Sequence, residues 1–167
     1  VSDGSEIASS VYDYPTGEQG ILLDPKDPNL ARQNPADYIE GFYRSVRGAM
    51  RAAKNVDGFA PENVVGLGVD ATGSTPIPVD RDGSALAMHK QFQNNLAAQA
   101  WLWKDHTSHA EAAVITEKAR QDKTDYLAKC GGIYSSEWYW SKILHCKRTA
   151  PKVFDAAYGW VEQADFI

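Results

Sequence analysis

The sequence contains no long apolar segment and few cysteines. No run of apolar residues approaches the roughly 20 that a membrane-spanning helix needs, so we expect no contact with a membrane. The two cysteines, Cys130 and Cys146, do not have the spacing of a metal site. A disulfide between them is possible but not required, and a reduced, cytoplasmic protein fits this cysteine usage best.

The sequence also has few positively charged residues and lacks several enzyme motifs. The chain has 17 lysines and arginines against 22 aspartates and glutamates, a net charge of −5 that disfavours nonspecific binding to nucleic acid. A Walker phosphate loop, a G-x-S-x-G nucleophile elbow and an H-E-x-x-H metal helix are all missing. His106 and His109 lie three residues apart, but without a third ligand nearby this spacing is a weak metal signal.

The remaining composition is that of one globular domain. Of 167 residues, 43% are hydrophobic and 23% charged, which argues against disorder and allows a sizeable core. The chain starts at Val1 without a methionine, and residues 5–14 predict a strand that leaves a turn at Asp3 and Gly4. We therefore interpret the sequence as a fragment of a longer protein.

The order of apolar segments and of the residues that begin and end helices and strands predicts an α/β domain. A long loop is expected at 15–33, and then a helix to residue 54 that Asn34 caps and Pro35 begins. The apolar run Val64–Val69 predicts a central strand that is covered on both faces. Beyond it we expect strands on either side of a turn at Asp82 and Gly83, and helices that Ser108 (with Glu111 in a capping box), Ser135 and Thr149 cap.

The first candidate site is the stretch Asp70–Thr75, directly after the expected central strand. Open α/β sheets hold ligands at the carboxyl ends of their strands. The small residues there would let a ligand approach the backbone, and the hydroxyls of Thr72, Ser74 and Thr75 suit a polyhydroxylated ligand. An ordinary polar turn, capped by Asp70, is the alternative interpretation.

Two further stretches carry side chains suited to a sugar site. Trp103, Lys104, Asp105 and His106 place an aromatic face, a cation, a carboxylate and an imidazole in consecutive positions. The alternative is a helix end with core tryptophans and a solvated Lys104–Asp105 pair. In "GGIYSSEWYWSKILH", Glu137 falls on a first helical turn, where the helix dipole favours a carboxylate whatever its function.

These stretches, "GVDATGSTPIPVDRDG", "LWKDHTSHAEA" and "GGIYSSEWYWSKILH", resemble successive motifs of the FGGY carbohydrate kinase family. The similarity extends from the helix at Asn34 to "YGWVEQADFI". It implies the actin/hexokinase-like fold of that family, with two ribonuclease-H-like domains and a cleft between them. Residues 1–167 would be part of the N-terminal, sugar-binding domain, an α/β unit with a mixed sheet and flanking helices.

The resemblance also implies which residues contact the sugar. Gly73 stands where relatives carry larger polar side chains, His106 where many carry arginine, and Glu137 where tyrosine is common. Lys142 matches a lysine that is common in the family, and we expect it to be structural. The residues expected to bind the substrate are Ala71, Thr72, Gly73, Ser74, Trp103, Lys104, Asp105 and Glu137.

The function implied is ATP-dependent phosphorylation of a ketopentose, with the 5-hydroxyl of L-ribulose as the expected acceptor, as in L-arabinose catabolism. Xylulose or another sugar is the alternative substrate. ATP and Mg²⁺ would serve the full-length enzyme and would not bind to this chain. The family's first phosphate motif would precede Val1, and its catalytic aspartate and adenosine site would follow Ile167. We therefore assign no catalytic residue and expect the isolated chain to be inactive.

Two other classes of function stay open at this point. One is a noncatalytic sugar-binding module, and the other is a hydrolase that uses paired carboxylates such as Asp70 and Glu137. In each case the expected partner is a small-molecule sugar. An unpaired sheet edge would also favour association of the chain with itself as a homo-oligomer.

Overall fold

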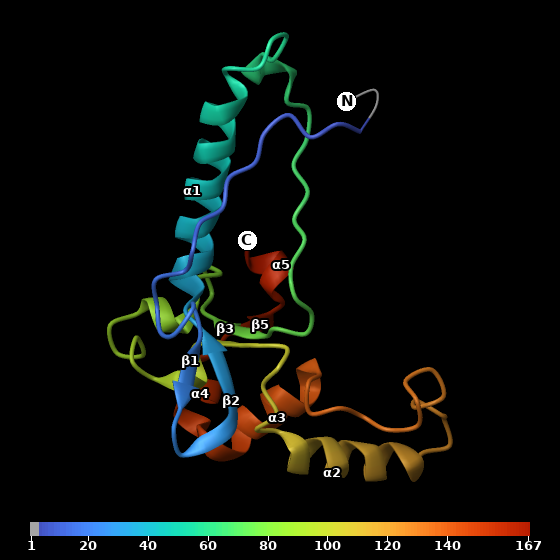
Figure 1. Cartoon of the computed structure of the whole chain (residues 1–167). Coiled ribbons are helices and arrows are strands. Elements are labelled where there is room, and N and C mark those ends of the chain that lie inside the picture. Colours follow the sequence, from blue (N-terminus) through green and yellow to red (C-terminus); the bar gives the residue numbers. More distant parts are fainter. Residues whose placement is uncertain (1–3) are drawn as a thin grey trace.

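A long helix, shorter helices and two small sheets make up the structure, a computed structural model that describes residues 4–167 (Figure 1). The long helix α1 (Pro35–Ala53) begins where the sequence predicts, because the side chain of Asn34 accepts a hydrogen bond from the backbone N–H of Ala36 at 3.1 Å. Proline at the first position sacrifices no helical hydrogen bond. The helix ends at Lys54, as predicted.

Both sheets of the described chain are antiparallel. The first has the order β1-β2-β4, with β1 (Leu22–Asp24), β2 (Asp27–Gln33) and β4 (Ala100–Trp101). The second pairs β3 (Ile77–Val79) with β5 (Gly159–Val161). The predicted mixed α/β composition is confirmed, whereas a mixed sheet is not found within residues 4–167.

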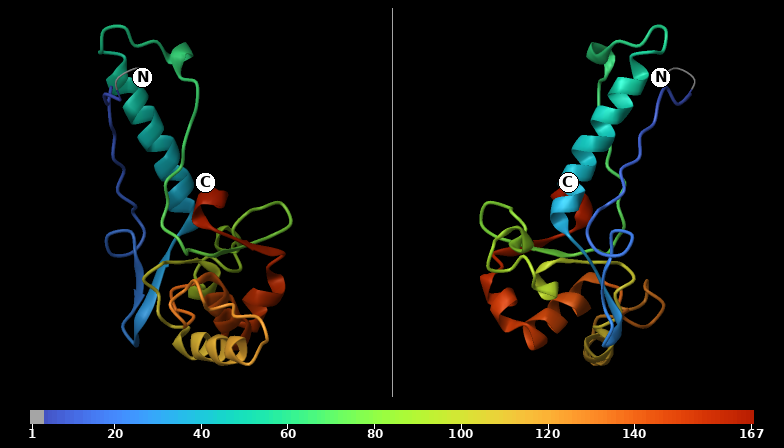
Figure 2. Two further views of the ribbon diagram at one scale, coloured as in Figure 1. Left: turned by 90° about the vertical axis from the view of Figure 1, so that its right-hand side faces the viewer. Right: turned by 60° about the vertical axis from the view of Figure 1, so that its left-hand side comes forward.

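The shorter helices gather on the side of the sheets away from the tip of α1 (Figures 1 and 2). They are α2 (His109–Arg120), α3 (Tyr139–Thr149) and α4 (Pro151–Ala156), with α5 (Gln163–Phe166) near the base of α1, and short 3₁₀ turns at Pro61–Asn63, Leu86–Met88 and Leu96–Ala98. No helix of the described residues is both long and apolar enough to cross a membrane.

The helix caps expected after residue 100 are wrong in detail. Ser108 occupies the N-cap position of α2, but its hydroxyl donates to the carbonyl of Ser136 at 2.8 Å instead of capping the helix. Helix α3 starts at Tyr139, and the Ser135 hydroxyl accepts from the N–H of Glu137 in the turn before it. Thr149 belongs to the end of α3, where its hydroxyl donates to a carbonyl of its own helix.

The core consists of two clusters on opposite sides of β4. Trp101 packs with Leu86, Cys146 and Val153, while its neighbour Ala100 packs with a second cluster that contains Ile77. Successive residues of a strand point to opposite faces, so this short strand contributes to both clusters. It thereby places the segment that follows it, residues 102–105, at a fixed position beside β3.

The N-terminal segments differ most from the predictions. Residues 5–14 form no strand, and they run along α1 so closely that a Cβ at Gly41 would lie 2.7 Å from Tyr14. The predicted loop at 15–33 contains β1 and β2, so that prediction is wrong. The predicted turn at Asp3 and Gly4 lies partly outside the described residues.

The predicted central strand Val64–Val69 is also wrong. These residues are extended but unpaired within the described chain, and Val65 is 99% exposed. A strand forms where a neighbouring segment offers free backbone groups, and no described segment pairs with this one. The next apolar stretch does form β3, and the turn at Asp82 and Gly83 follows as predicted, but a single bridge at Ala85 replaces the second strand.

Candidate functional site

A cavity of about 420 Å³ lies where the loop before β3 meets the segment after β4. We call it the polar groove. Its lining contains hydroxyl, amide, carboxylate and ammonium groups together with aromatic rings, which is the mixture that recognises a small polyhydroxylated ligand. The lining residues are Tyr14, Ile21, Gln33, Asp70, Ala71, Thr72, Leu102, Trp103, Lys104 and Gln163.

The polar groove joins two of the motifs singled out in the sequence. Ala71 and Thr72 come from the first motif, and Trp103 and Lys104 come from the second. Trp103 is 46% exposed, so its ring is available to a ligand. The structure therefore brings together half of the residues predicted to bind the substrate.

The lining includes three residues that can form hydrogen bonds and that were not among the predicted site residues. Tyr14 and Gln33 come from segments predicted as strand and loop, and Gln163 stands at the start of α5. The amide of Gln33 is held by the hydroxyl of Tyr38, which donates to it at 2.8 Å. Gln163 lies in the last stretch of the resemblance, whereas tertiary packing alone brings Tyr14 and Gln33 to the groove.

The loop that carries Thr72 is tied to the C-terminal part of the chain. The Thr72 hydroxyl donates to the side-chain oxygen of Gln163 at 2.8 Å. The Ser74 hydroxyl donates to Oε1 of Glu162 at 2.8 Å, and the backbone N–H of Thr75 donates to Oε2 at 2.7 Å. Each of these bonds spans more than eighty residues, so the loop is shaped by tertiary contacts.

Lys142 connects the two walls of the groove from behind. Its ammonium donates to the carbonyl of Ser74 at 2.7 Å and to the carbonyl of Leu102 at 2.7 Å, with Trp101 O at 3.5 Å. Burial lowers the pKa of Lys142 to about 7, and the Arg32 guanidinium lowers it as well. The side chain is fully buried and contacts backbone carbonyls, as a structural residue does.

Asp105 lies behind the second wall and does not line the groove. It is fully buried, accepts a hydrogen bond from Ala31 N at 2.7 Å and one from the Thr107 hydroxyl at 2.6 Å, and forms an ion pair with Arg32. The Arg32 guanidinium in turn lies 3.5 Å from the ring centre of Trp101. All of this fixes the backbone next to Trp103 and Lys104.

The other predicted contacts also lie outside the lining. Gly73 adjoins Thr72, and a Cβ built on it would meet nothing within 4 Å. Ser74 is engaged by Glu162 and Lys142. Glu137 is half exposed, 3.7 Å from Nε2 of His106. A pair of carboxylates formed by Asp70 and Glu137 is therefore not gathered in this groove.

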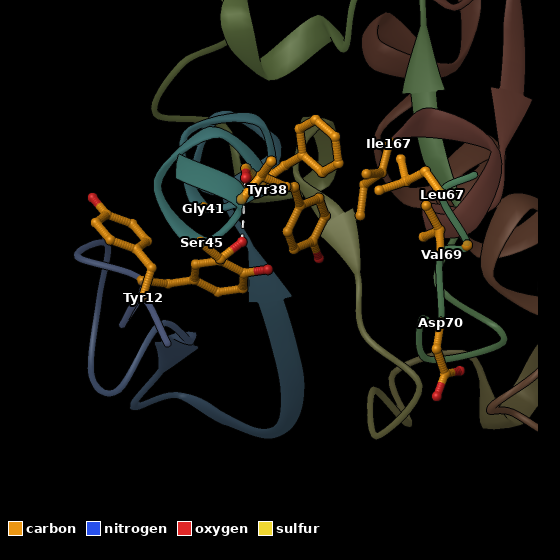
Figure 3. Close-up of a pocket in the computed structure, with 12 residues that line it drawn as sticks. Tyr12, Tyr38, Gly41, Ser45, Leu67, Val69, Asp70 and Ile167 are labelled. Carbon is orange, nitrogen blue, oxygen red and sulfur yellow. Dashed lines mark hydrogen bonds between the residues drawn. The ribbon is translucent and has the colours of Figure 1, made fainter. Parts of the chain in front are cut away.

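A second cavity, of about 310 Å³, adjoins the first and shares Tyr14 and Asp70 with it. Figure 3 shows tyrosines beside α1 on one side and Leu67, Val69 and Asp70 on the other, with Ile167 between them. Within residues 4–167, no group of three or more His, Cys, Asp or Glu side chains is placed to hold a metal ion.

The fold is that of part of a sugar kinase. Over 88% of its length the chain superposes on 27% of the xylulose kinase from Rhodospirillum rubrum, with a TM-score of 0.67 and 20% identity. Over 90% of its length it superposes on 27% of a xyloylose kinase from Brucella ovis, with a TM-score of 0.63 and 19% identity. At these identities the likeness concerns the fold alone. No family model matches the chain.

The curated relatives that the chain matches in sequence share one name. The chain is 38% identical to the ribulokinase of Vibrio parahaemolyticus over 98% of its length, and 32% identical to that of Bacillus licheniformis over 100%. It spans 28% and 30% of the length of these relatives. The resemblance to FGGY carbohydrate kinases predicted from the three motifs is confirmed, and the curated relatives it matches are ribulokinases.

Proposed function

We propose that this chain forms the sugar-binding part of an ATP-dependent kinase that phosphorylates a ketopentose, with L-ribulose as the substrate. The observation that carries the proposal is the polar groove, which unites two separate motifs of the resemblance around one cavity. The name shared by the curated relatives supports L-ribulose, whereas the solved neighbours are xylulose kinases. Xylulose is therefore the alternative sugar to test.

The groove offers the contacts that such a substrate needs. The Trp103 ring would pack against the carbon face of the sugar, while Asp70 and Thr72 would accept hydrogen bonds from its hydroxyls. Phosphoryl transfer depends mainly on positioning and electrostatic stabilisation. The contribution of this chain would be to hold the acceptor hydroxyl in place.

ATP and Mg²⁺ belong to the proposal for the whole protein. They would supply the phosphoryl group and neutralise charge during its transfer. We assign no catalytic step to the described residues. The role in L-arabinose catabolism, the cytoplasmic location and any self-association remain predictions.

Titration of the ¹⁵N-labelled chain with L-ribulose, and separately with D-xylulose, tests the proposal. L-ribulose should shift the amide signals of Ala71 and Thr72 and the indole signal of Trp103 in a saturable way, and D-xylulose should bind more weakly. Trp103→Ala should abolish the shifts, while Trp140→Ala, which alters a tryptophan that is 63% exposed and outside the groove, should preserve them. If neither sugar shifts any groove signal, the proposed function is wrong.

A further inference from the structure

The two walls of the polar groove are joined at their base, where Trp101 N donates to Pro76 O at 3.0 Å and Ala100 packs with Ile77. The chain before Asp70 is exposed, and the loop that follows it is held by hydrogen bonds to residues far along the sequence. Thr75 is nevertheless fully buried, so the loop has a defined position. Besides the bond from Thr72 to Gln163, two side chains of opposite charge hold this loop, Lys142 and Glu162.

Lys142 fixes the distance between the walls. An ammonium group has three N–H donors, and here they are directed at carbonyls from both sides: Ser74 on one wall, Leu102 and Trp101 on the other. The carbonyl oxygens of Ser74 and Leu102 lie at the same short distance from one nitrogen atom. Their separation is thus limited, and with it the width of the groove between Thr72 and Trp103.

Glu162 binds two other polar groups of the same loop. Its two carboxylate oxygens accept from the Ser74 hydroxyl and from the Thr75 N–H. Hydrogen bonds to a charged acceptor are stronger than neutral ones. Ser74 is therefore held through its carbonyl by a cation and through its hydroxyl by an anion, and neither charge lines the groove itself.

We infer that Lys142 and Glu162 are positioning residues for the sugar site: they clamp the loop 72–75 against the segment 101–104 and so set the geometry in which a ketopentose is held. The inference assigns a role in ligand binding to a lysine whose sequence context predicted a purely structural one. It rests on the proposed function for the identity of the ligand, but the clamp itself is a property of the free chain.

The test compares Lys142→Met, which keeps an unbranched side chain of similar length and removes the ammonium, with Lys152→Met at an exposed position. In the free chain, Lys142→Met should move or broaden the amide signals of residues 72–75 and leave those of α1 and α2 unchanged. Affinity for L-ribulose should fall about tenfold or more. Lys152→Met should change neither property.

Glu162→Gln decides the outcome if Lys142→Met does not fold. It retains one oxygen acceptor and should disturb the signals of Ser74 and Thr75 with a smaller loss of affinity. Unchanged loop signals in a folded variant would overturn the clamp, whether or not sugar binds. Absence of sugar binding to the wild-type chain, with the loop signals disturbed in both variants, would overturn the proposed function and leave the clamp standing.

The pH dependence of the affinity for L-ribulose distinguishes a positioning role of Lys142 from a contribution to stability alone. The charged groups that face Lys142 are Arg32, Glu137 and Glu162, and burial lowers its pKa to about 7. Above this pH the neutral amine has two N–H donors for three carbonyls, so affinity for L-ribulose should fall as pH rises through about 7. The same profile is measured in Lys142→Met, in which the fall in affinity through about pH 7 should be absent. A slope that survives Lys142→Met would contradict the inference.

Discussion

Two apolar stretches separated by a few residues differ sharply in burial. In Val64–Val69, Val65 is 99% exposed and Leu67 is 68% exposed, whereas in β3 Ile77 is fully buried and Val79 is 5% exposed. The difference is the partner: β3 pairs with β5, more than seventy residues further along the chain, and the earlier stretch pairs with no described segment. Apolar composition thus shows that a segment can be buried, and topology decides whether it is.

The largest loss of stability is expected from removing the buried carboxylate of Asp105 behind the groove. Asp105→Ala would leave the guanidinium of Arg32 buried without its carboxylate and would free Ala31 N. Breaking a buried pair in this way costs about 3–5 kcal/mol of unfolding free energy, a large part of the stability of a small domain.

Urea unfolding measures this loss, and Asp57→Ala at an exposed position is the control, with an expected change within about 0.5 kcal/mol. Equal midpoints for the two variants would show that the Arg32–Asp105 pair does not support the fold.

The comparison of the two apolar stretches can be tested directly. Ile77→Ala should lower the unfolding free energy by about 2–5 kcal/mol, because it leaves a cavity in a fully buried site. Leu67→Ala removes a side chain that is largely exposed and should change it by about 0.5 kcal/mol or less. The same urea series measures both. A large loss at Leu67 would mean that the exposed stretch packs against something in solution, for instance a second copy of the chain.

The sequence predicted those parts of the fold that local chemistry determines. The side chain of Asn34 and the ring of Pro35 fix the start of α1 without help from distant residues. The hairpin of β1 and β2 escaped prediction because β2 reads "DPNLARQ", in which aspartate and proline are typical of loops. Pairing with β4 stabilises this segment, and that partner lies far along the chain.

The candidate site was predictable to the extent that motifs carry it. Thr72 and Trp103 belong to recognisable motifs and do meet at one cavity. Glu162 and Gln163, which shape the loop, stand in the last stretch of the resemblance, but nothing in that stretch indicates which loop they bind. Polar groups that act through tertiary hydrogen bonds leave no periodic signal, so the supporting residues emerge only from the fold.

The smallest change in stability, with a clear effect on binding, is expected at Gly73. Its φ lies outside the left-handed region and a Cβ there meets open space, so the conformation does not require glycine. Gly73→Leu should alter the unfolding free energy by about 0.5 kcal/mol or less. The new side chain would occupy the space beside Thr72 and weaken L-ribulose binding about tenfold or more, a loss of about 1.4 kcal/mol.

Gly66→Leu is the matched control, because this glycine also has open space around it and lies outside both cavities. Both variants are titrated with L-ribulose while the amide signals of Ala71 and the indole signal of Trp103 are followed. If a folded Gly73→Leu variant binds the sugar as tightly as Gly66→Leu does, the space beside Thr72 is not where the ketopentose lies. Stretch 70–75 would then be the polar turn of the alternative interpretation, held in place by Lys142 and Glu162 for stability alone.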